Sequence, residues 1–326
     1  MNTLDRIAAA LPGKVKAAGS LGELCTYRVG GNATAVVEID SVGDLEVLYR
    51  TVPATMPFLV VGAGSNLLVS DGGFPGIAVR LGDSFAEVEV VDDGDGADVD
   101  GVRARVILGG AAMLPRAARK LAAKGVTGFE WAVGVPGTVG GAVRMNAGGH
   151  GSDMAAAVTS VSVFNLRTGG PNMWTSADCA FGYRSSAIGP DDVVLYAELA
   201  LTRSGGTGSD GIGSGGTGSS ELAEIVAWRR ANQPGGQNAG SVFANPEGHS
   251  AGRLIDESGL KGFRIGTAAV SDKHANFIQA DPNGSADDVE ALIRHIQRVV
   301  LERTRIELHV ENRLIGFDTD ATKGQS

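Results

Sequence analysis

Cysteine is scarce in this sequence, with two residues, Cys25 and Cys179, among 326. Two cysteines so far apart provide neither a disulfide framework nor a zinc site, so both are predicted to be buried thiols in a reducing compartment. No stretch of about 18 apolar residues occurs, as a membrane-spanning helix would need. Residues 1–14 also lack the apolar core of a signal peptide. These absences predict a cytoplasmic protein without membrane insertion.

Basic clusters are equally rare. Lys and Arg form no run longer than a pair such as Arg229-Arg230, and the formal net charge is −9. A nucleic-acid partner normally requires a basic excess on one face, so no such partner is expected. An anionic small ligand is still allowed, because single Arg side chains and helix N-termini bind anions. The length and a hydrophobic content of 43% predict a folded protein of two or three domains.

Glycine, by contrast, is abundant, with 49 residues. Part of it lies in residues 204–220, SGGTGSDGIGSGGTGSS, which cannot bury enough apolar surface to fold and are expected to be a flexible linker. Residues 92–101, DDGDGADVDG, are expected to form an acidic loop. The remaining glycines lie in compact clusters between strand-like runs, where we expect the functional information.

Hydrophobic periodicity predicts helices and strands in mixed order, without a regular βαβ repeat, which favours an α+β fold over a doubly wound sheet. The clearest helix is Ser285–Arg303, which begins at a capping-box-like Ser285 and Asp288 and carries one apolar stripe. The other predicted helices are 42–52, 111–124, 221–232 and 251–258. The predicted strands are 36–39, 58–61, 76–81, 104–108, 158–165 and 193–202.

A glycine-rich cluster, Gly62-Ala63-Gly64-Ser65-Asn66, follows the predicted strand 58–61. Its glycines let backbone N–H groups approach a ligand, and the Ser and Asn side chains add hydrogen bonds, which suits a diphosphate. The cluster is not a Rossmann fingerprint, because Leu67 replaces the third glycine, and no Gly-Lys-Ser/Thr follows as in a P-loop. A pair of tight turns without a ligand fits the spacing equally well.

A second cluster, GVPGTVGG at residues 134–141, contains too much glycine and proline for a regular helix or strand. We expect a long, shaped backbone loop, and such loops usually carry function. A flat cofactor ring can lie against backbone that has no side chains in the way. The two clusters together therefore favour a bound cofactor.

Three segments together, YRVGGNA (27–33), VGAGSNLLVSDGGFPGIAVRL (61–81) and GFEWAVGVPGTVGGAVRMNAGGHG (128–151), resemble the FAD-binding half of the UDP-N-acetylenolpyruvoylglucosamine reductases. This family belongs to the vanillyl-alcohol-oxidase-type flavoproteins, and the similarity covers roughly residues 20–317. It implies a PCMH-type FAD-binding domain in two lobes (1–80 and 81–203), a linker (204–220), a substrate-binding domain (221–317) and a disordered tail (318–326). The lack of a folded insertion points to the shorter type of the family.

The resemblance implies that FAD is held non-covalently, without attachment to His150. The residues that would contact FAD are Gly62, Ala63, Gly64, Ser65, Asn66, Val133, Gly134, Pro136, Gly137, Thr138, Gly140, Gly141 and Ala142. It further implies NADPH as electron donor, a UDP-sugar substrate of cell-wall peptidoglycan synthesis, and a monomer. The substrate contacts implied are Tyr183, Asn245, His274 and Arg313. No metal site is expected.

Three catalytic residues match family motifs: Arg184 in GYRSS, Ser241 in GSVFANP and Glu311 in LHVENRLIG. A fixed cation stabilises the enolate that follows hydride transfer, the carboxylate helps to position the substrate, and the hydroxyl donates a proton. Each residue alone also fits a plain role as an ion pair, a turn residue or a solvent-facing strand residue. Asn312 departs from the usual Glu-Val-Arg pattern of the family. An oxidase of the same flavin fold and a non-catalytic flavin-binding protein are the rival interpretations.

Overall fold

The computed structural model describes residues 2–91, 103–203 and 218–317. The chain divides into two compact units, each assembled from three segments. Unit 1 contains Met1–Val15, Val37–Ala63 and Ala78–Ala231, and unit 2 contains Lys16–Val36, Gly64–Ile77 and Asn232–Ser326. The predicted acidic loop, most of the predicted Gly/Ser linker and the predicted tail lie outside the described residues. One correction concerns residues 218–220, which form the first turn of α5 and not part of a linker.

Unit 1 is built on a six-stranded antiparallel sheet with the order β12-β11-β13-β7-β6, in which β8 also pairs with β13. The predicted strand 193–202 is confirmed as β13, and its residues Leu195, Ala197, Leu199 and Leu201 are all buried. The strands are β6 (Val88–Val91), β7 (Arg103–Gly109), β8 (Val126–Thr127), β11 (Val158–Asn165), β12 (Pro171–Thr175) and β13 (Asp192–Arg203). The short strands β9 (Gly148–Gly149) and β10 (Ser152–Asp153) form a separate hairpin.

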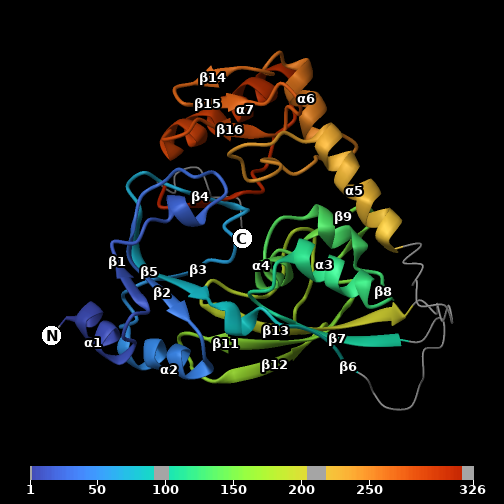
Figure 1. The fold of residues 1–326 in the computed structure, drawn as a ribbon. Coiled ribbons are helices and arrows are strands. Elements are labelled where there is room, and N and C mark those ends of the chain that lie inside the picture. Colours follow the sequence, from blue (N-terminus) through green and yellow to red (C-terminus); the bar gives the residue numbers. More distant parts are fainter. Residues whose placement is uncertain (1, 92–102, 204–217, 318–326) are drawn as a thin grey trace. The chain divides into compact units, whose positions relative to one another are not determined.

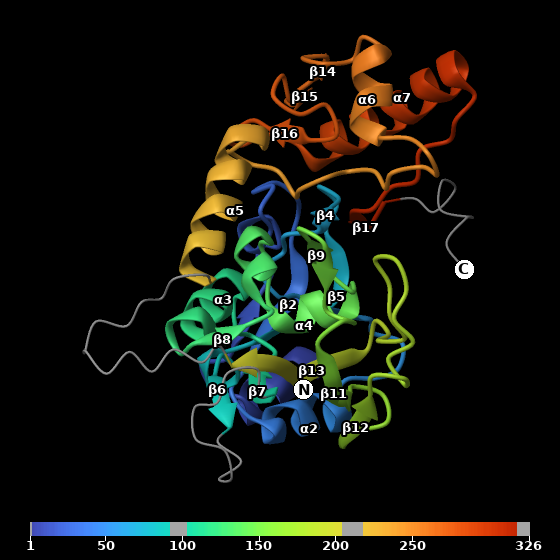
Figure 2. The same cartoon turned by 90° about the vertical axis from the view of Figure 1, so that its right-hand side faces the viewer.

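Helices α3 (Leu114–Ala123) and α4 (Val139–Arg144) lie on one face of this sheet (Figures 1 and 2). The helix predicted over 111–124 is confirmed as α3, and its residues Leu114, Ala117, Ala118 and Leu121 are buried on one face. They enter one core with the sheet residues and with the 3-10 turn η3 (Glu130–Gly134). Both cysteines are buried free thiols, as predicted.

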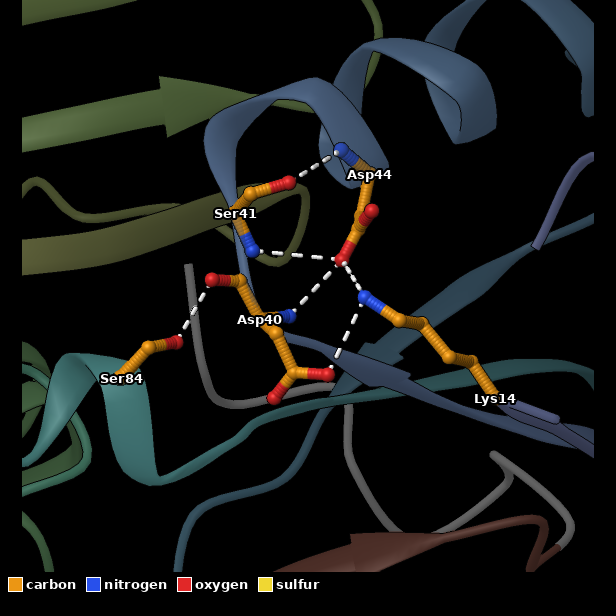
Figure 3. Close-up of polar contacts among 5 residues, drawn as sticks. All are labelled: Lys14, Asp40, Ser41, Asp44 and Ser84. Carbon is orange, nitrogen blue, oxygen red and sulfur yellow. Dashed lines mark hydrogen bonds and ion pairs between the residues drawn. The ribbon is translucent and has the colours of Figure 1, made fainter. Parts of the chain in front are cut away.

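The remaining helices of unit 1 are α1 (Thr3–Ala10), α2 (Val42–Thr51) and α5 (Gly218–Asn232). A polar cluster fixes the start of α2 (Figure 3). Ser41 Oγ accepts from the N–H of Asp44, whose carboxylate accepts from the Asp40 and Ser41 N–H groups and from Lys14 Nζ at 2.6 Å. Ser84 Oγ donates to the Asp40 carbonyl at 2.6 Å. This hydrogen bond joins Ser84 to the residue that precedes the N-cap of α2.

A four-stranded sheet has the order β1-β2-β5-β3. Its strands are β1 (Val15–Ala17), β2 (Ala33–Ile39), β3 (Phe58–Val60) and β5 (Phe74–Leu81). Strands 36–39, 58–61 and 76–81 were predicted within it, and β2 and β5 begin earlier than the hydrophobic runs suggested. Short 3-10 turns at η1 (Gly22–Leu24) and η2 (Asp83–Phe85) complete this part of the chain.

In unit 2, α7 (Ala286–Thr304) packs against a three-stranded antiparallel sheet and against α6 (Ala251–Glu257), as both views show (Figures 1 and 2). The predicted stripe of α7 is confirmed except that Val299 is only partly buried. The sheet consists of β14 (Arg264–Ile265), β15 (Ala268–Val270) and β16 (Ile278–Ala280). A separate parallel pair joins β4 (Leu67–Val69) to β17 (Arg313–Ile315).

The start of α7 uses only half of the predicted capping box. Ser285 Oγ accepts from the N–H of Asp288, as expected. The Asp288 carboxylate instead accepts from the N–H and hydroxyl of Thr267, both at 2.7 Å. The Ser285 N–H, which a complete box would pair with Asp288, donates to Thr267 Oγ1 at 2.8 Å. The carboxylate of Asp71 adds further contacts, because it accepts from the Ser285 hydroxyl at 2.6 Å and from the Ala286 N–H at 3.0 Å.

The expectation that residues 134–141 form only a loop is wrong. Gly134 ends η3, and Val139–Arg144 is a short α-helix whose N-cap is Thr138. Glycine is tolerated in this helix because space is limited: a Cβ on Gly140 would lie 3.1 Å from the carbonyl oxygen of Gly110. Close packing on the neighbouring strand therefore overrides the low helix propensity of glycine.

Candidate active site

Unit 1 contains a cavity of about 340 Å³ beside the first glycine cluster. Five predicted FAD contacts line it: Gly62, Ala63, Thr138, Gly140 and Gly141. Arg80 and Arg144 add cationic side chains, and Asp83 and Asp192 add carboxylates, none of which the sequence had suggested. This size is typical of small-molecule sites, which combine an apolar lining with a few convergent polar groups.

The backbone at this cavity has unused hydrogen-bond donors. Within the described part of the chain, the N–H groups of Gly62 and Ala63 donate no hydrogen bond. A Cβ on Gly62 would lie 2.3 Å from Thr138 Oγ1, so only glycine lets the two segments meet here. Free N–H groups beside a glycine-lined wall are what an anionic cofactor needs.

The first turn of α4 does not offer such donors. The N–H groups of Val139 and Gly140 donate to the carbonyls of Ala112 and Gly110, each at 2.9 Å, and the Gly141 N–H donates to Thr138 Oγ1 at 3.3 Å. The other predicted contacts of this region are absent from the described lining of the cavity: Val133, Gly134, Pro136, Gly137 and Ala142. Val133 and Ala142 are buried in the core instead.

Arg184 and Tyr183 line a second cavity of unit 1, of about 350 Å³, with Asn146 and Asp153. Arg184 has a left-handed backbone (φ 52°), and its guanidinium lies 5.5 Å from the centre of the Tyr183 ring. Asn146 is buried, and its amide donates to the Gly182 carbonyl at 2.9 Å and to the Asp153 carboxylate at 3.2 Å. Asn146 therefore supports the loop that carries Arg184, a role that sequence reasoning missed.

Ser241 and Glu311 come together in unit 2. Residues 242–244 and 309–311 are hydrogen-bonded as an antiparallel pair, with a bridge between Phe243 and Val310. The Glu311 N–H donates to the Val242 carbonyl at 2.7 Å. This pairing places the two predicted catalytic residues on neighbouring segments, although helices α6 and α7 lie between them in the sequence.

Part of the first glycine cluster also lies in unit 2, next to this pair. Gly64 has φ +61°, and a Cβ there would lie 2.1 Å from the Leu24 carbonyl oxygen. The Asn66 side-chain amide donates to the Glu311 carbonyl at 3.2 Å, and the Asn66 carbonyl accepts from the Arg313 N–H at 2.9 Å. Asn66 therefore connects the predicted cofactor segment to the segment that carries Glu311, and Ser65 lies between Gly64 and Asn66.

The predicted substrate contacts of unit 2 have distinct environments. Burial lowers the pKa of His274, whose Nδ1 accepts from the Asn276 N–H at 3.2 Å. Burial also lowers the pKa of the Arg313 guanidinium. Asn245 is exposed, but its side-chain oxygen accepts from the Ala251 N–H at 3.0 Å, at the start of α6.

Two other kinds of feature are absent from the described residues. No group of three or more His, Cys, Asp or Glu side chains there is arranged to hold a metal ion. None of the helices described has the combination of length and apolarity needed to cross a membrane.

Comparison with known proteins assigns both parts of the chain. A family model for the FAD binding domain matches residues 33–170, and one for the C-terminal domain of UDP-N-acetylenolpyruvoylglucosamine reductase matches residues 232–315. The UDP-N-acetylenolpyruvoylglucosamine reductase of Paramagnetospirillum magneticum is 38% identical over 297 residues, which is 91% of this chain and 90% of the relative. The reductase of a Synechococcus strain is 39% identical over 92% of each chain.

A solved structure is similar over both units. The crystal structure of UDP-N-acetylenolpyruvylglucosamine reductase from Thermus caldophilus has a TM-score of 0.73 and 33% identity, over 91% of this chain and 97% of that one. The likeness confirms the predicted α+β fold with a PCMH-type FAD-binding domain and a C-terminal domain. On sequence and structure together, the chain belongs to the UDP-N-acetylenolpyruvoylglucosamine reductase family.

Proposed function

We propose that this protein reduces the enolpyruvyl ether of UDP-N-acetylglucosamine to UDP-N-acetylmuramate, a step of peptidoglycan synthesis. The observation that carries the proposal is the backbone pairing of residues 242–244, directly after Ser241, with residues 309–311, which Asn66 joins to the glycine cluster. The proposed proton donor, the proposed carboxylate and the part of the predicted cofactor segment that begins at Gly64 thus belong to one unit. The relatives named above carry this activity in their names, which gives the same reaction class independent support.

FAD suits the cavity of unit 1. Gly62 and Ala63 would offer their free N–H groups to the diphosphate, and Arg80 and Arg144 would offset its negative charge. Thr138 packs directly on Gly62 and would limit how deeply the cofactor enters. When bound, the flavin supplies a hydride to the β-carbon of the enolpyruvyl group.

The residues of the chain account for the rest of the reaction. Addition of hydride to the β-carbon leaves an electron pair at the α-carbon, delocalised into the carboxylate. The Arg184 guanidinium would stabilise that charge, and Glu311 would orient the substrate carboxylate. Ser241 would transfer its hydroxyl proton to the α-carbon and recover a proton from solvent, so that one hydride and one proton saturate the double bond.

Further parts of the proposal concern the partners. NADPH is the proposed electron donor, and Tyr183, Asn245, His274 and Arg313 are proposed to contact the UDP-sugar. We propose that the enzyme acts in the cytoplasm, because its substrate is a soluble sugar nucleotide. We also propose that it is a monomer without a nucleic-acid partner. FAD is proposed to bind without a covalent link.

The activity is tested by following NADPH oxidation through its near-ultraviolet absorbance, with and without the enolpyruvyl substrate. The expected result is a yellow protein whose NADPH oxidation depends on that substrate and yields UDP-N-acetylmuramate. A colourless protein that takes up no FAD would exclude the proposal. Turnover that depends on oxygen and not on the enolpyruvyl substrate would identify an oxidase instead.

The proton donor is tested with Ser241→Ala in rapid-mixing experiments on each half-reaction. Flavin reduction by NADPH should stay within about twofold of the wild type, and flavin reoxidation by the substrate should slow by about a hundredfold or more, as loss of a positioned acid requires. Equal slowing of both half-reactions would show that Ser241 is not the acid.

A further inference from the structure

The side chain of Asn312 makes an unusual set of contacts beside the proposed proton donor. Asn312 is 4% exposed, and its amide nitrogen lies 2.9 Å from Asn66 Oδ1, 3.0 Å from the Ala239 carbonyl and 3.4 Å from the Ser241 carbonyl. The two hydrogens of one NH2 group are therefore shared among three oxygens. Those oxygens come from two segments of unit 2 that are remote in sequence from Asn312 and from each other.

The orientation of this amide follows from chemistry. If the amide were flipped, its oxygen would face three other oxygens, which repel it, whereas the NH2 group attracts all three. The oxygen of Asn312 is consequently directed elsewhere, and in the described part of the protein it is buried without a hydrogen-bond partner. A buried amide oxygen without a hydrogen-bond partner destabilises the folded protein. The contacts of the Asn312 NH2 group are therefore present together with this loss of stability.

Hydrogen bonds of Glu311, the residue before Asn312, join the same two segments. The Glu311 N–H donates to the Val242 carbonyl, and the Asn66 amide donates to the Glu311 carbonyl. Asn66 thus receives a hydrogen bond from Asn312 and donates one to the residue before it. The carbonyl of Ser241 lies within reach of the Asn312 amide, so this side chain contacts the backbone of the proposed donor itself.

We propose that Asn312 is a positioning residue, whose amide holds the Ser241 backbone at a fixed place relative to Asn66 and Glu311. This inference rests on the proposed function, because it assigns Asn312 to the proton-transfer step. A valine at this position, as in the usual pattern of the family, fills the space without joining the segments.

The consequence is a specific kinetic signature. Asn312→Val removes the three contacts and also the buried, unpartnered oxygen, so the protein should fold. The donor hydroxyl should then sample a wider range of positions. We expect reoxidation of the flavin by the enolpyruvyl substrate to slow by about tenfold or more, because small misplacements of reacting groups are costly. Flavin reduction by NADPH should stay within about twofold of the wild type.

The experiment compares four FAD-loaded proteins: wild type, Asn312→Val, Ser241→Ala and Leu292→Ala. Leu292 lies in the buried stripe of α7, and its side chain has no polar atom that could bond to Ser241 or Asn66, so it controls for loss of stability in unit 2. The rates of both half-reactions and the solvent deuterium isotope effect on reoxidation are measured for each. Asn312→Val should show a larger isotope effect than the wild type, and Leu292→Ala an unchanged one.

Several outcomes overturn the inference. Equal slowing of both half-reactions in Asn312→Val, or the same pattern in Leu292→Ala, would assign Asn312 to stability alone. Reoxidation of Asn312→Val within about twofold of the wild type, with an unchanged isotope effect, would show that the amide positions nothing. Failure of the reductase proposal looks different, since the wild type itself would then not be reoxidised by the substrate. If the Asn312→Val protein does not fold, Asn312→Ser, which keeps one donor, takes its place with the same criteria.

Discussion

Replacement of Gly64 by alanine tests how closely the glycine cluster packs on its neighbours. Gly64 has φ +61°, and an added Cβ would lie 2.1 Å from the Leu24 carbonyl oxygen and 2.6 Å from Cys25 Cα. Both neighbours are backbone atoms, which cannot rotate aside as a side chain can. Thr26 further fixes Gly64, because its N–H donates to the Gly64 carbonyl at 3.2 Å. The backbone around Leu24 must therefore move if Gly64→Ala is to fold.

Two costs add in this variant. A left-handed backbone costs an L-residue about 1–2 kcal/mol, and overpacking of a filled space costs about 1–3 kcal/mol. Alanine also restricts the conformations of the unfolded chain, which offsets less than about 1 kcal/mol of these two costs. We therefore expect Gly64→Ala to lower the free energy of unfolding by about 2–4 kcal/mol. It should also lower the FAD content of the purified protein, because the predicted diphosphate segment moves.

Gly248→Ala is the matched control in the same unit. Gly248 has φ +71°, and nothing lies within 4 Å of the position of its Cβ, so only the backbone cost applies. The two variants are compared by urea unfolding followed by far-ultraviolet circular dichroism, since Trp131, Trp174 and Trp228 all lie in unit 1. If the two variants lower the free energy of unfolding equally, the inference that Gly64 packs closely on Leu24 is wrong.

Two other predictions concern helix starts. Asp71→Ala should lower the free energy of unfolding by about 1–2 kcal/mol, because the carboxylate that accepts from the Ala286 N–H at the start of α7 is lost. Thermal unfolding measures this loss, and an unchanged midpoint would contradict the prediction. Burial raises the pKa of Asp44, but hydrogen bonds from Lys14, Asp40 and Ser41 outweigh it and hold the pKa below its ordinary value of 3.8. Because the unfolded chain then binds a proton more readily, the stabilisation is present above pH 3.8 and is lost as the pH falls through the lower folded value. Asp44→Asn should flatten the acid side of the stability profile, and a profile parallel to the wild type would refute this.

Helices and strands whose apolar residues recur at the spacing of one face were predictable from sequence. Helices α2, α3, α6 and α7 and strands β7, β11 and β13 carry apolar residues at the spacing of one buried face. Helix α4 was not predicted, because its two glycines and nearby proline argue against a helix, and its stability comes from contact with Gly110 and Val194. Strand β4 was missed for a similar reason, since it is short and its partner lies near the other end of the chain.

The candidate site was predictable as a set of residue types but not as a geometry. The matched motifs named Ser241, Glu311 and Asn66, and the structure shows that all three belong to one hydrogen-bonded arrangement. Asn312 appeared in the sequence only as a departure from a pattern. Its contact with Asn66 spans 246 residues, and no local rule predicts a hydrogen bond over that separation.

The parallel pairing of β4 with β17 has a consequence for synthesis of the chain. Residues 67–69 have no strand partner in this pair until residues 313–315 have been made, long after residues 67–69 themselves. Strand β4 therefore cannot pair with β17 while the chain is still being made. Until then, the apolar residues of β4 lack this partner strand. Such non-local closure slows folding and favours aggregation. A premature stop before Arg313 would thus also leave β4, made early in synthesis, without its partner strand.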